Sequence, residues 1–241
     1  MNNVLKMVGL IVMALSFSSC GNDEPEESSL SFELPSFDKI QVNSYFHLYL
    51  KQDTVFSIHM VGDESLIDDV RFSVENGVLY LTHESDKLWR MPSDHEVKLY
   101  ISSDQLKQIV VKETCFIETI NPITTHEFGI IEGYRYFEAR LELACNIFYF
   151  WNGSPCGGKL TLEGNVNYLR IWNYINMSVD AINLNADNAM VENHSTGDCM
   201  VRVMETLEYG IYGKGNIYLY GEPNQIILKE KTSTGELIRV E

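Results

Sequence analysis

Apolar and polar residues alternate with a period of two along most of the chain. In residues 37–53, the side chains of Phe46, Leu48 and Leu50 fall on one side of this pattern. Similar short stretches follow at residues 54–63, 70–84 and 96–106, and Gly, Asn and Asp separate them. Such alternation is typical of β-strands that bury one face, whereas a helical pattern fits only residues 63–70. The sequence therefore predicts an all-β protein with one short helix.

Within residues 70–84, the dipeptide Asn76-Gly77 interrupts the alternation. Asn and Gly readily adopt the positive φ angles that a tight hairpin turn requires. We therefore expect the strands on either side of this dipeptide to pair as a β-hairpin.

A second regularity appears after residue 100, with a step of twenty residues. From Val111 this step reaches an apolar residue each time, at Ile131, Trp151, Ile171, Val191 and Ile211. Two residues further on, the same step reaches Glu113, Gly133, Gly153, Asn173, Asn193 and Gly213. Since Gly and Asn adopt positive φ most readily, we expect the first series to point inward and the second to occupy corners.

A unit of this length is too short for a pair of helices and suits short strands joined by sharp corners. Equivalent strands would then stack about 4.8 Å apart along one axis. The sequence thus predicts a β-helix or β-solenoid over residues 101–241, with Asn173 and Asn193 stacked as a hydrogen-bonded corner ladder. Residues 31–100 are expected to form an N-terminal β region that caps one end, and residues 226–241 to close the other.

Residues 1–19 predict a lipoprotein signal peptide. Lys6 precedes an apolar run from Val8 to Leu15, which is too short to span a bilayer. Small residues then lead to Cys20, an arrangement that resembles a bacterial lipobox, in which the cysteine is acylated. The alternative is an ordinary signal peptide, with Cys20 a free thiol. Residues 20–30 are mainly acidic or small and predict a flexible tether.

The net charge of −16 disfavours nucleic acids and anionic lipid surfaces as partners, since both require a basic face. Membrane attachment would come from the acyl chains at Cys20. The acidic run after Cys20 also resembles the surface-export signal of Bacteroidetes lipoproteins. We therefore expect an outer-membrane lipoprotein at the cell surface; the alternative is a spacer that faces the periplasm.

The remaining cysteines form no metal-binding or redox motif. They are Cys115, Cys145, Cys156 and Cys199, and none lies in a CxxC or zinc-type spacing. Buried free thiols are the favoured interpretation, and Cys145 with Cys156 is the pairing to test. The six histidines also lack the HxH and HExxH spacings. We expect neither a metal nor a cofactor.

Two stretches resemble a known family. Val61-Gly62-Asp63-Glu64 and Asn76-Gly77-Val78-Leu79 are similar to the opening of the putative auto-transporter adhesin family with the head GIN domain, whose members are mostly exported Bacteroidetes proteins. Residues 213–223 match its recurring glycine pattern, whereas the stretches at 151–153 and 172–174 are bulkier than its usual rungs. The resemblance spans about residues 37–241. It implies a two-part, all-β, β-helix-like fold and a binding role.

Gly213-Lys214-Gly215 is a poor phosphate-binding motif, because a P-loop requires a longer spacing and a following helix. Aromatic residues are better candidates for function, since an outward aromatic strip would stack on sugar rings or form a protein interface. By strand alternation, the candidates for an exposed binding surface are Phe150, Trp172, Tyr174, Tyr212, Tyr218 and Tyr220. The competing interpretation is that most of these side chains fill the core.

A carbohydrate-active enzyme is the catalytic alternative, because pectinase-like enzymes use β-helices. Glycoside hydrolysis usually requires two carboxylates close together. Glu132 and Glu192 share a phase but lie three rungs apart, about 14 Å by the stacking distance. The sequence therefore favours a non-catalytic, adhesin-like protein that binds a glycan or a protein at the cell surface. A purely structural envelope protein remains the third hypothesis.

Overall fold

The computed structural model describes residues 27–84, 97–133, 135–153 and 156–240. The predicted signal peptide and Cys20 lie outside the described residues, as do residues 21–26 of the tether. Residues 27–30 belong to strand β1 (Glu27–Glu33), which pairs antiparallel with β4 (Ser57–Asp63). The tether prediction is therefore wrong for these four residues. The backbone of these residues forms hydrogen bonds with β4, and this pairing orders them. The sequence did not predict it, because most of their side chains are polar and bury no core.

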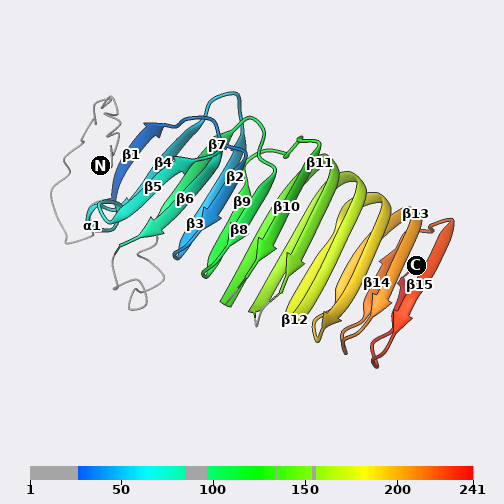
Figure 1. The fold of residues 1–241 in the computed structure, drawn as a ribbon. Coiled ribbons are helices and arrows are strands. Elements are labelled where there is room, and N and C mark those ends of the chain that lie inside the picture. Colours follow the sequence, from blue (N-terminus) through cyan, green and yellow to red (C-terminus); the bar gives the residue numbers. More distant parts are fainter. Residues whose placement is uncertain (1–26, 85–96, 134, 154–155, 241) are drawn as a thin grey trace.

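The protein is an elongated β-solenoid, and its strands follow one another from the N-terminal to the C-terminal end (Figure 1). Its C-terminal region contains about 6 turns of the solenoid, here called rungs. The predicted all-β, solenoid-like fold is confirmed. Inward side chains of the described residues form one continuous apolar core, which includes Leu48, Phe128 and Phe150.

Two series of strands enclose this core, and we call them sheet 1 and sheet 2. Sheet 1 runs in the order β5 (Val70–Glu75), β6 (Val78–His83), β2 (Lys39–Val42), β8 (Gln108–Val111), β10 (Glu127–Glu132) and the second half of β11 (Arg135–Asn152). Sheet 2 runs in the order β1, β4, β7 (Lys98–Ser103), β3 (Phe46–Gln52), β9 (Cys115–Thr119) and the first half of β11.

The long strands bend and take part in both sheets. These are β11, β12 (Cys156–Ser195) and β13 (Cys199–Ile211). At the C-terminal end, β15 (Gln225–Lys231) completes sheet 1, whereas β14 (Ile217–Tyr220) and β16 (Leu237–Val240) complete sheet 2. Each rung thus contributes one stretch to each sheet.

Antiparallel strands and a helix distinguish the N-terminal end. Strands β1, β4 and β5 pair antiparallel with their neighbours, and α1 (Glu64–Ile67) lies beside β1 and β4. Strands β2, β3, β6 and β7, by contrast, pair parallel and in register with the solenoid. The capping elements are therefore a subset of the N-terminal β region. The predicted hairpin is confirmed, since Asn76 and Gly77 have φ angles of 52° and 78°.

The rungs are not uniformly twenty residues long. In sheet 1, Ile109 pairs with Ile130, Ile130 with Phe150, and Phe150 with Ile171, which gives steps of 21, 20 and 21 residues. A fixed step of twenty therefore falls out of phase by one residue in two rungs. The inward assignment of Ile131 and Trp151 is wrong, because Ile130 and Phe150 hold the buried positions there.

Buried polar side chains line the corner that follows sheet 1. Asn152, Asn173 and Asn193 are each fully buried. The Asn173 Nδ2 donates to the Asn193 Oδ1 at 3.1 Å, and the Asn193 Nδ2 donates to the carbonyl of Gly197. The predicted corner ladder is thus confirmed. It satisfies backbone groups where the chain leaves the sheet.

The glycines of residues 213–215 are architectural. A Cβ atom at Gly213 would lie 2.1 Å from the carbonyl oxygen of Ser195, and one at Gly215 would lie 2.0 Å from that of Gly197. No side chain fits between rungs stacked this closely. The rejection of a phosphate-binding loop is consistent with this packing.

Among the described residues, three cysteines are buried free thiols: Cys115, Cys145 and Cys199. The disulfide considered between Cys145 and Cys156 is therefore wrong, because Cys145 is free. Burial raises the pKa of the Cys145 thiol to about 12. Such a thiol behaves as a small apolar side chain rather than as a nucleophile.

Candidate functional site

The structure divides the six predicted binding residues among three environments. Phe150 is fully buried in the core, so its predicted outward orientation is wrong, for the same one-residue phase shift described above. Trp172, Tyr174 and Tyr212 lie on the outer side of sheet 1 and are partly exposed. Tyr218 and Tyr220 lie on β14, in sheet 2, and are also partly exposed.

The two sheet 2 tyrosines are engaged in local contacts. The Tyr218 hydroxyl accepts from the Asn216 Nδ2 at 3.4 Å, and the Arg202 guanidinium lies 5.8 Å from the centre of the Tyr220 ring. They do not join the other candidates, because β14 belongs to the opposite sheet.

The outer side of sheet 1 collects the other candidates into one aromatic surface. Its members are Tyr149, Trp151, Tyr168, Trp172, Tyr174 and Tyr212, which we call the sheet 1 aromatic surface. Trp151 and Trp172 are register partners on adjacent rungs, and Trp151 is 40% exposed. Trp151 was not predicted to point outward, because a constant step of twenty residues places it on the inward side.

Part of this surface is a stacked ladder, formed by Tyr174, His194 and Tyr212. The His194 ring lies 4.2 Å from the Tyr174 ring and 4.1 Å from the Tyr212 ring, and the ring planes are within 11° and 7° of parallel. Desolvation and the nearby Glu192 carboxylate raise the pKa of both tyrosines. The rings stack along the solenoid axis, so His194 uses both faces, and Tyr174 and Tyr212 one face each, to contact their neighbours.

Tyr149 lies flat against the backbone. A Cβ atom on its register partner Gly129 would lie 2.2–2.4 Å from three atoms of the ring, at nearly equal distances, so the face of the ring covers this glycine. Gly129 is also the register partner of Gln108, and the Gln108 Nε2 donates to the Tyr149 hydroxyl at 2.8 Å. The ring therefore crosses strand β10 and is fixed on its far side. Burial raises the pKa of this phenol, which favours its neutral form.

Trp151 is flat in the same way. A Cβ atom on Gly153 would lie 2.1, 2.3 and 2.9 Å from three atoms of its six-membered ring. The indole thus leans along its own strand over a residue that has no side chain. We call Tyr149 and Trp151 the flat ring pair. Since one face of each ring rests on the glycine backbone, the opposite face is directed away from the protein.

Charged groups border the flat ring pair. Arg170 is the register partner of Tyr149 on the next rung, and its guanidinium lies 4.9 Å from the centre of the Tyr168 ring. Glu127 lies on strand β10 and interacts electrostatically with the Tyr149 phenol. The border therefore offers both a cationic donor and an anionic acceptor.

Sheet 2 contains a second ring series near the N-terminal end, which the sequence pattern did not predict. Its stacked centre is His47, Tyr49 and Tyr100, with ring centres 4.5 and 4.7 Å apart and planes within 18° and 12° of parallel. His59 and Phe116 extend it across neighbouring strands. The signal was present as alternating aromatic residues on separate strands, but it required the register between strands to be known.

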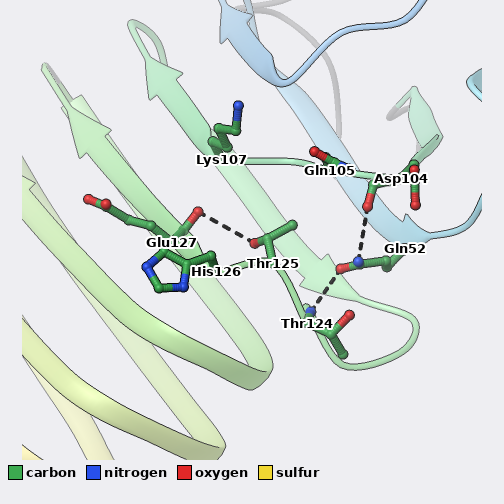
Figure 2. A pocket seen from close by; sticks show the side chains of 8 residues that line it. All are labelled: Gln52, Asp104, Gln105, Lys107, Thr124, Thr125, His126 and Glu127. Atoms are coloured by element: carbon green, nitrogen blue, oxygen red, sulfur yellow. Dashed lines mark hydrogen bonds between the residues drawn. The ribbon is translucent and has the colours of Figure 1, made fainter.

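A cavity of about 520 Å³ lined by polar residues lies between the end of β3, the segment that joins β7 to β8 and the segment that leads into β10 (Figure 2). Gln52 spans it: its Nε2 donates to the Asp104 carbonyl at 3.0 Å, and its Oε1 accepts from the Thr124 amide at 2.8 Å. Figure 2 shows the Asp104 and Glu127 side chains on opposite sides, with Glu127 directed away from Asp104. The cavity therefore does not bring a carboxylate pair together.

The other acids of the enzyme alternative do not converge either. Glu132 is fully buried at a corner of the core, whereas the Glu192 side chain is partly exposed on sheet 1 beside His194. Among the described residues, no group of three His, Cys, Asp or Glu side chains is placed to hold a metal ion. In the same part of the chain, no helix is long and apolar enough to cross a membrane.

Comparison with solved structures supports the fold. A putative adhesin from Bacteroides fragilis has a TM-score of 0.76 and 19% identity, with 90% of this chain and 98% of the other covered. A putative lipid binding protein from Parabacteroides distasonis has a TM-score of 0.63 and 17% identity, with 89% and 97% covered. A putative adhesin from the same organism has a TM-score of 0.59 and 17% identity, with 89% and 98% covered. At these identities the likeness concerns the fold alone.

Comparison by sequence identifies the family. None of the curated proteins matches the chain. A family model described as "Putative auto-transporter adhesin, head GIN domain" matches residues 36–223, which include the rungs that hold the sheet 1 aromatic surface. The resemblance noted from residues 61–64 and 76–79 is confirmed, and the chain belongs to this adhesin family.

Proposed function

We propose that this protein is an exported, lipid-anchored, non-catalytic binding protein of the cell envelope, with an adhesin-like role at the cell surface. The observation that supports it best is the sheet 1 aromatic surface, where Trp151 remains 40% exposed on a rigid stack of strands. Exposed aromatic surfaces on soluble folds mark interaction sites more often than chance. The ligand class at this level is a glycan or a protein.

Attachment is proposed to occur through acyl chains on Cys20. The segment after Cys20 is acidic and would separate the solenoid from the membrane. The overall charge of −16 favours a ligand recognised by stacking and hydrogen bonds rather than an anionic surface.

Two measurements test this proposal. In the native host, a Cys20→Ser variant is expected to leave the detergent phase in a phase partition assay, and protease treatment of intact cells is expected to degrade the wild-type protein. The soluble chain from Gly21 onward is expected to bind either a glycan array or a protein from envelope or host-cell extracts. Absence of binding in both assays would refute the binding role and leave a structural envelope role.

A further inference from the structure

The orientation of the rings in the sheet 1 aromatic surface indicates a class of ligand. This inference rests on the proposed binding function. We infer that Tyr149 and Trp151 form a carbohydrate-binding platform, with one sugar ring stacked on each aromatic face. The Tyr149 ring lies over Gly129, its register partner on β10, whereas the six-membered ring of Trp151 lies over Gly153, four residues beyond Tyr149. The two ring faces are therefore about 13 Å apart along the strand direction. This separation suits two non-consecutive units of one oligosaccharide.

Ring orientation distinguishes this pair from the ladder of Tyr174, His194 and Tyr212. Stacking on a sugar requires an aromatic face rather than an edge, because the apolar C–H groups of the sugar lie on the face of its ring. Both faces of His194 are covered, because Tyr174 and Tyr212 each lay one face against it along the solenoid axis. Tyr149 and Trp151 each rest one face on a glycine and direct the other outward.

The hydrogen-bonding groups around the platform match the hydroxyl groups of a sugar. The Tyr149 hydroxyl is held by Gln108, so the ring is fixed before a ligand arrives. Arg170 on the next rung offers donors, and Glu127 on β10 offers an acceptor. A platform that is already ordered loses little side-chain entropy on binding.

The size of the platform argues against a protein as the occupant. Two aromatic side chains bury about 300–500 Å² between them even when fully covered. A stable protein interface buries about 800 Å² on each partner. The flat ring pair therefore covers an oligosaccharide but forms only a small part of a protein interface.

The test uses the soluble chain from Gly21 onward on a glycan array, followed by calorimetric titration of the best oligosaccharide. Trp151→Ala removes one ring. Gly153→Ala keeps every aromatic group, but its Cβ would lie 2.1 Å from the indole, so the ring must lift from the backbone. We expect each variant to lose about tenfold in affinity, the equivalent of one stacking contact. Tyr220→Ala, on sheet 2, is the control and is expected to change affinity less than about twofold.

The possible outcomes separate this inference from the proposed function. If Trp151→Ala and Gly153→Ala both keep glycan binding, the platform is wrong and the protein binds glycans at another site. If no glycan on the array binds, but the chain captures a protein and Trp151→Ala abolishes that capture, only the carbohydrate assignment is wrong. If neither the glycan array nor the protein capture assay gives binding, the proposed function itself is wrong. Thermal unfolding of each variant checks that a loss of binding is not a loss of fold.

Discussion

Sheet 1 uses the same residue types in two ways within a few rungs. In the ladder of Tyr174, His194 and Tyr212, successive rungs supply a ring at the same position, and the rings stack on one another. Tyr149 and Trp151 instead lie over a glycine, Gly129 on the neighbouring strand and Gly153 on the same strand. A ring face that lies against another ring stabilises the fold, whereas a ring that rests on a glycine leaves its opposite face available to a ligand.

The glycines of sheet 1 and its corner are of two kinds. Gly129, Gly153 and, beside the ladder, Gly210 are close to ring atoms, which move when the side chain rotates. Gly213 and Gly215 are close to backbone carbonyls of the previous rung, which cannot move without separating the strands. We thus expect substitutions at Gly213 and Gly215 to lower stability and substitutions at Gly129 and Gly153 to lower binding.

Gly215→Ala is expected to have the largest effect on stability. Its Cβ would lie 2.0 Å from the Gly197 carbonyl oxygen, so the rungs must separate locally, which costs about 3 kcal/mol. Gly153→Ala is the matched control and should cost less than about 1 kcal/mol, because the indole can rotate away. Urea unfolding followed by circular dichroism measures both. Equal losses in the two variants would contradict the distinction between the two kinds of glycine.

His194→Ala is expected to have the next largest effect. It removes the central ring of the ladder and with it two stacking contacts, which together stabilise the fold by about 1–3 kcal/mol. His194→Phe keeps a ring in place and should recover most of that loss. Trp151→Ala should cost less than His194→Ala, since the indole is 40% exposed and leaves no cavity. If Trp151→Ala lowered the free energy of unfolding in urea more than His194→Ala, the proposed structural role of the ladder would be wrong.

The sequence was sufficient to predict the solenoid, but not which side chains point into the core and which point outward. Alternation and the recurrence of Gly and Asn led correctly to stacked rungs and to the contact between Asn173 and Asn193. The expected positive φ angles were wrong, since no Gly or Asn of that series has one. The asparagines are there for their hydrogen bonds, and Gly213 for its close approach to the previous rung. The assignment of Phe150 failed because one additional residue in a rung reverses the side of the sheet that each side chain faces. Rung length is set by how the corners pack, which a fixed step cannot represent.

The candidate site was predicted only in part for a related reason. Trp172, Tyr174 and Tyr212 were placed on the outer surface, because they lie in rungs where the step of twenty is in phase. The flat ring pair was not found, since it depends on which glycine lies beside which ring across two strands. Gly153 was interpreted by its backbone freedom alone, whereas the lack of a side chain at Gly129 and Gly153 is what the rings require.

A substitution at Ile175 is expected to have the smallest effect, and it tests whether the ladder region takes part in binding. It follows Tyr174, has a φ angle of 64°, and its side chain is 42% exposed. A β-branched residue in this region of backbone space is strained, whereas Asn adopts it readily. The conformation is held by the next rung, because the Ile175 carbonyl accepts from the Thr196 amide at 2.8 Å and from the Ser195 hydroxyl at 3.0 Å.

Ile175→Asn should therefore raise the free energy of unfolding by about 0.5–1 kcal/mol, because the strain is removed and little buried apolar contact is lost. If the ladder is purely structural, Ile175→Asn binds the oligosaccharide with unchanged affinity in calorimetric titration, whereas Trp151→Ala binds it more weakly. A gain in stability accompanied by a loss of affinity would instead mean that the binding surface extends from the flat ring pair to the corner. The strained Ile175 would then be a contact residue, and its exposed side chain would account for the strain being retained.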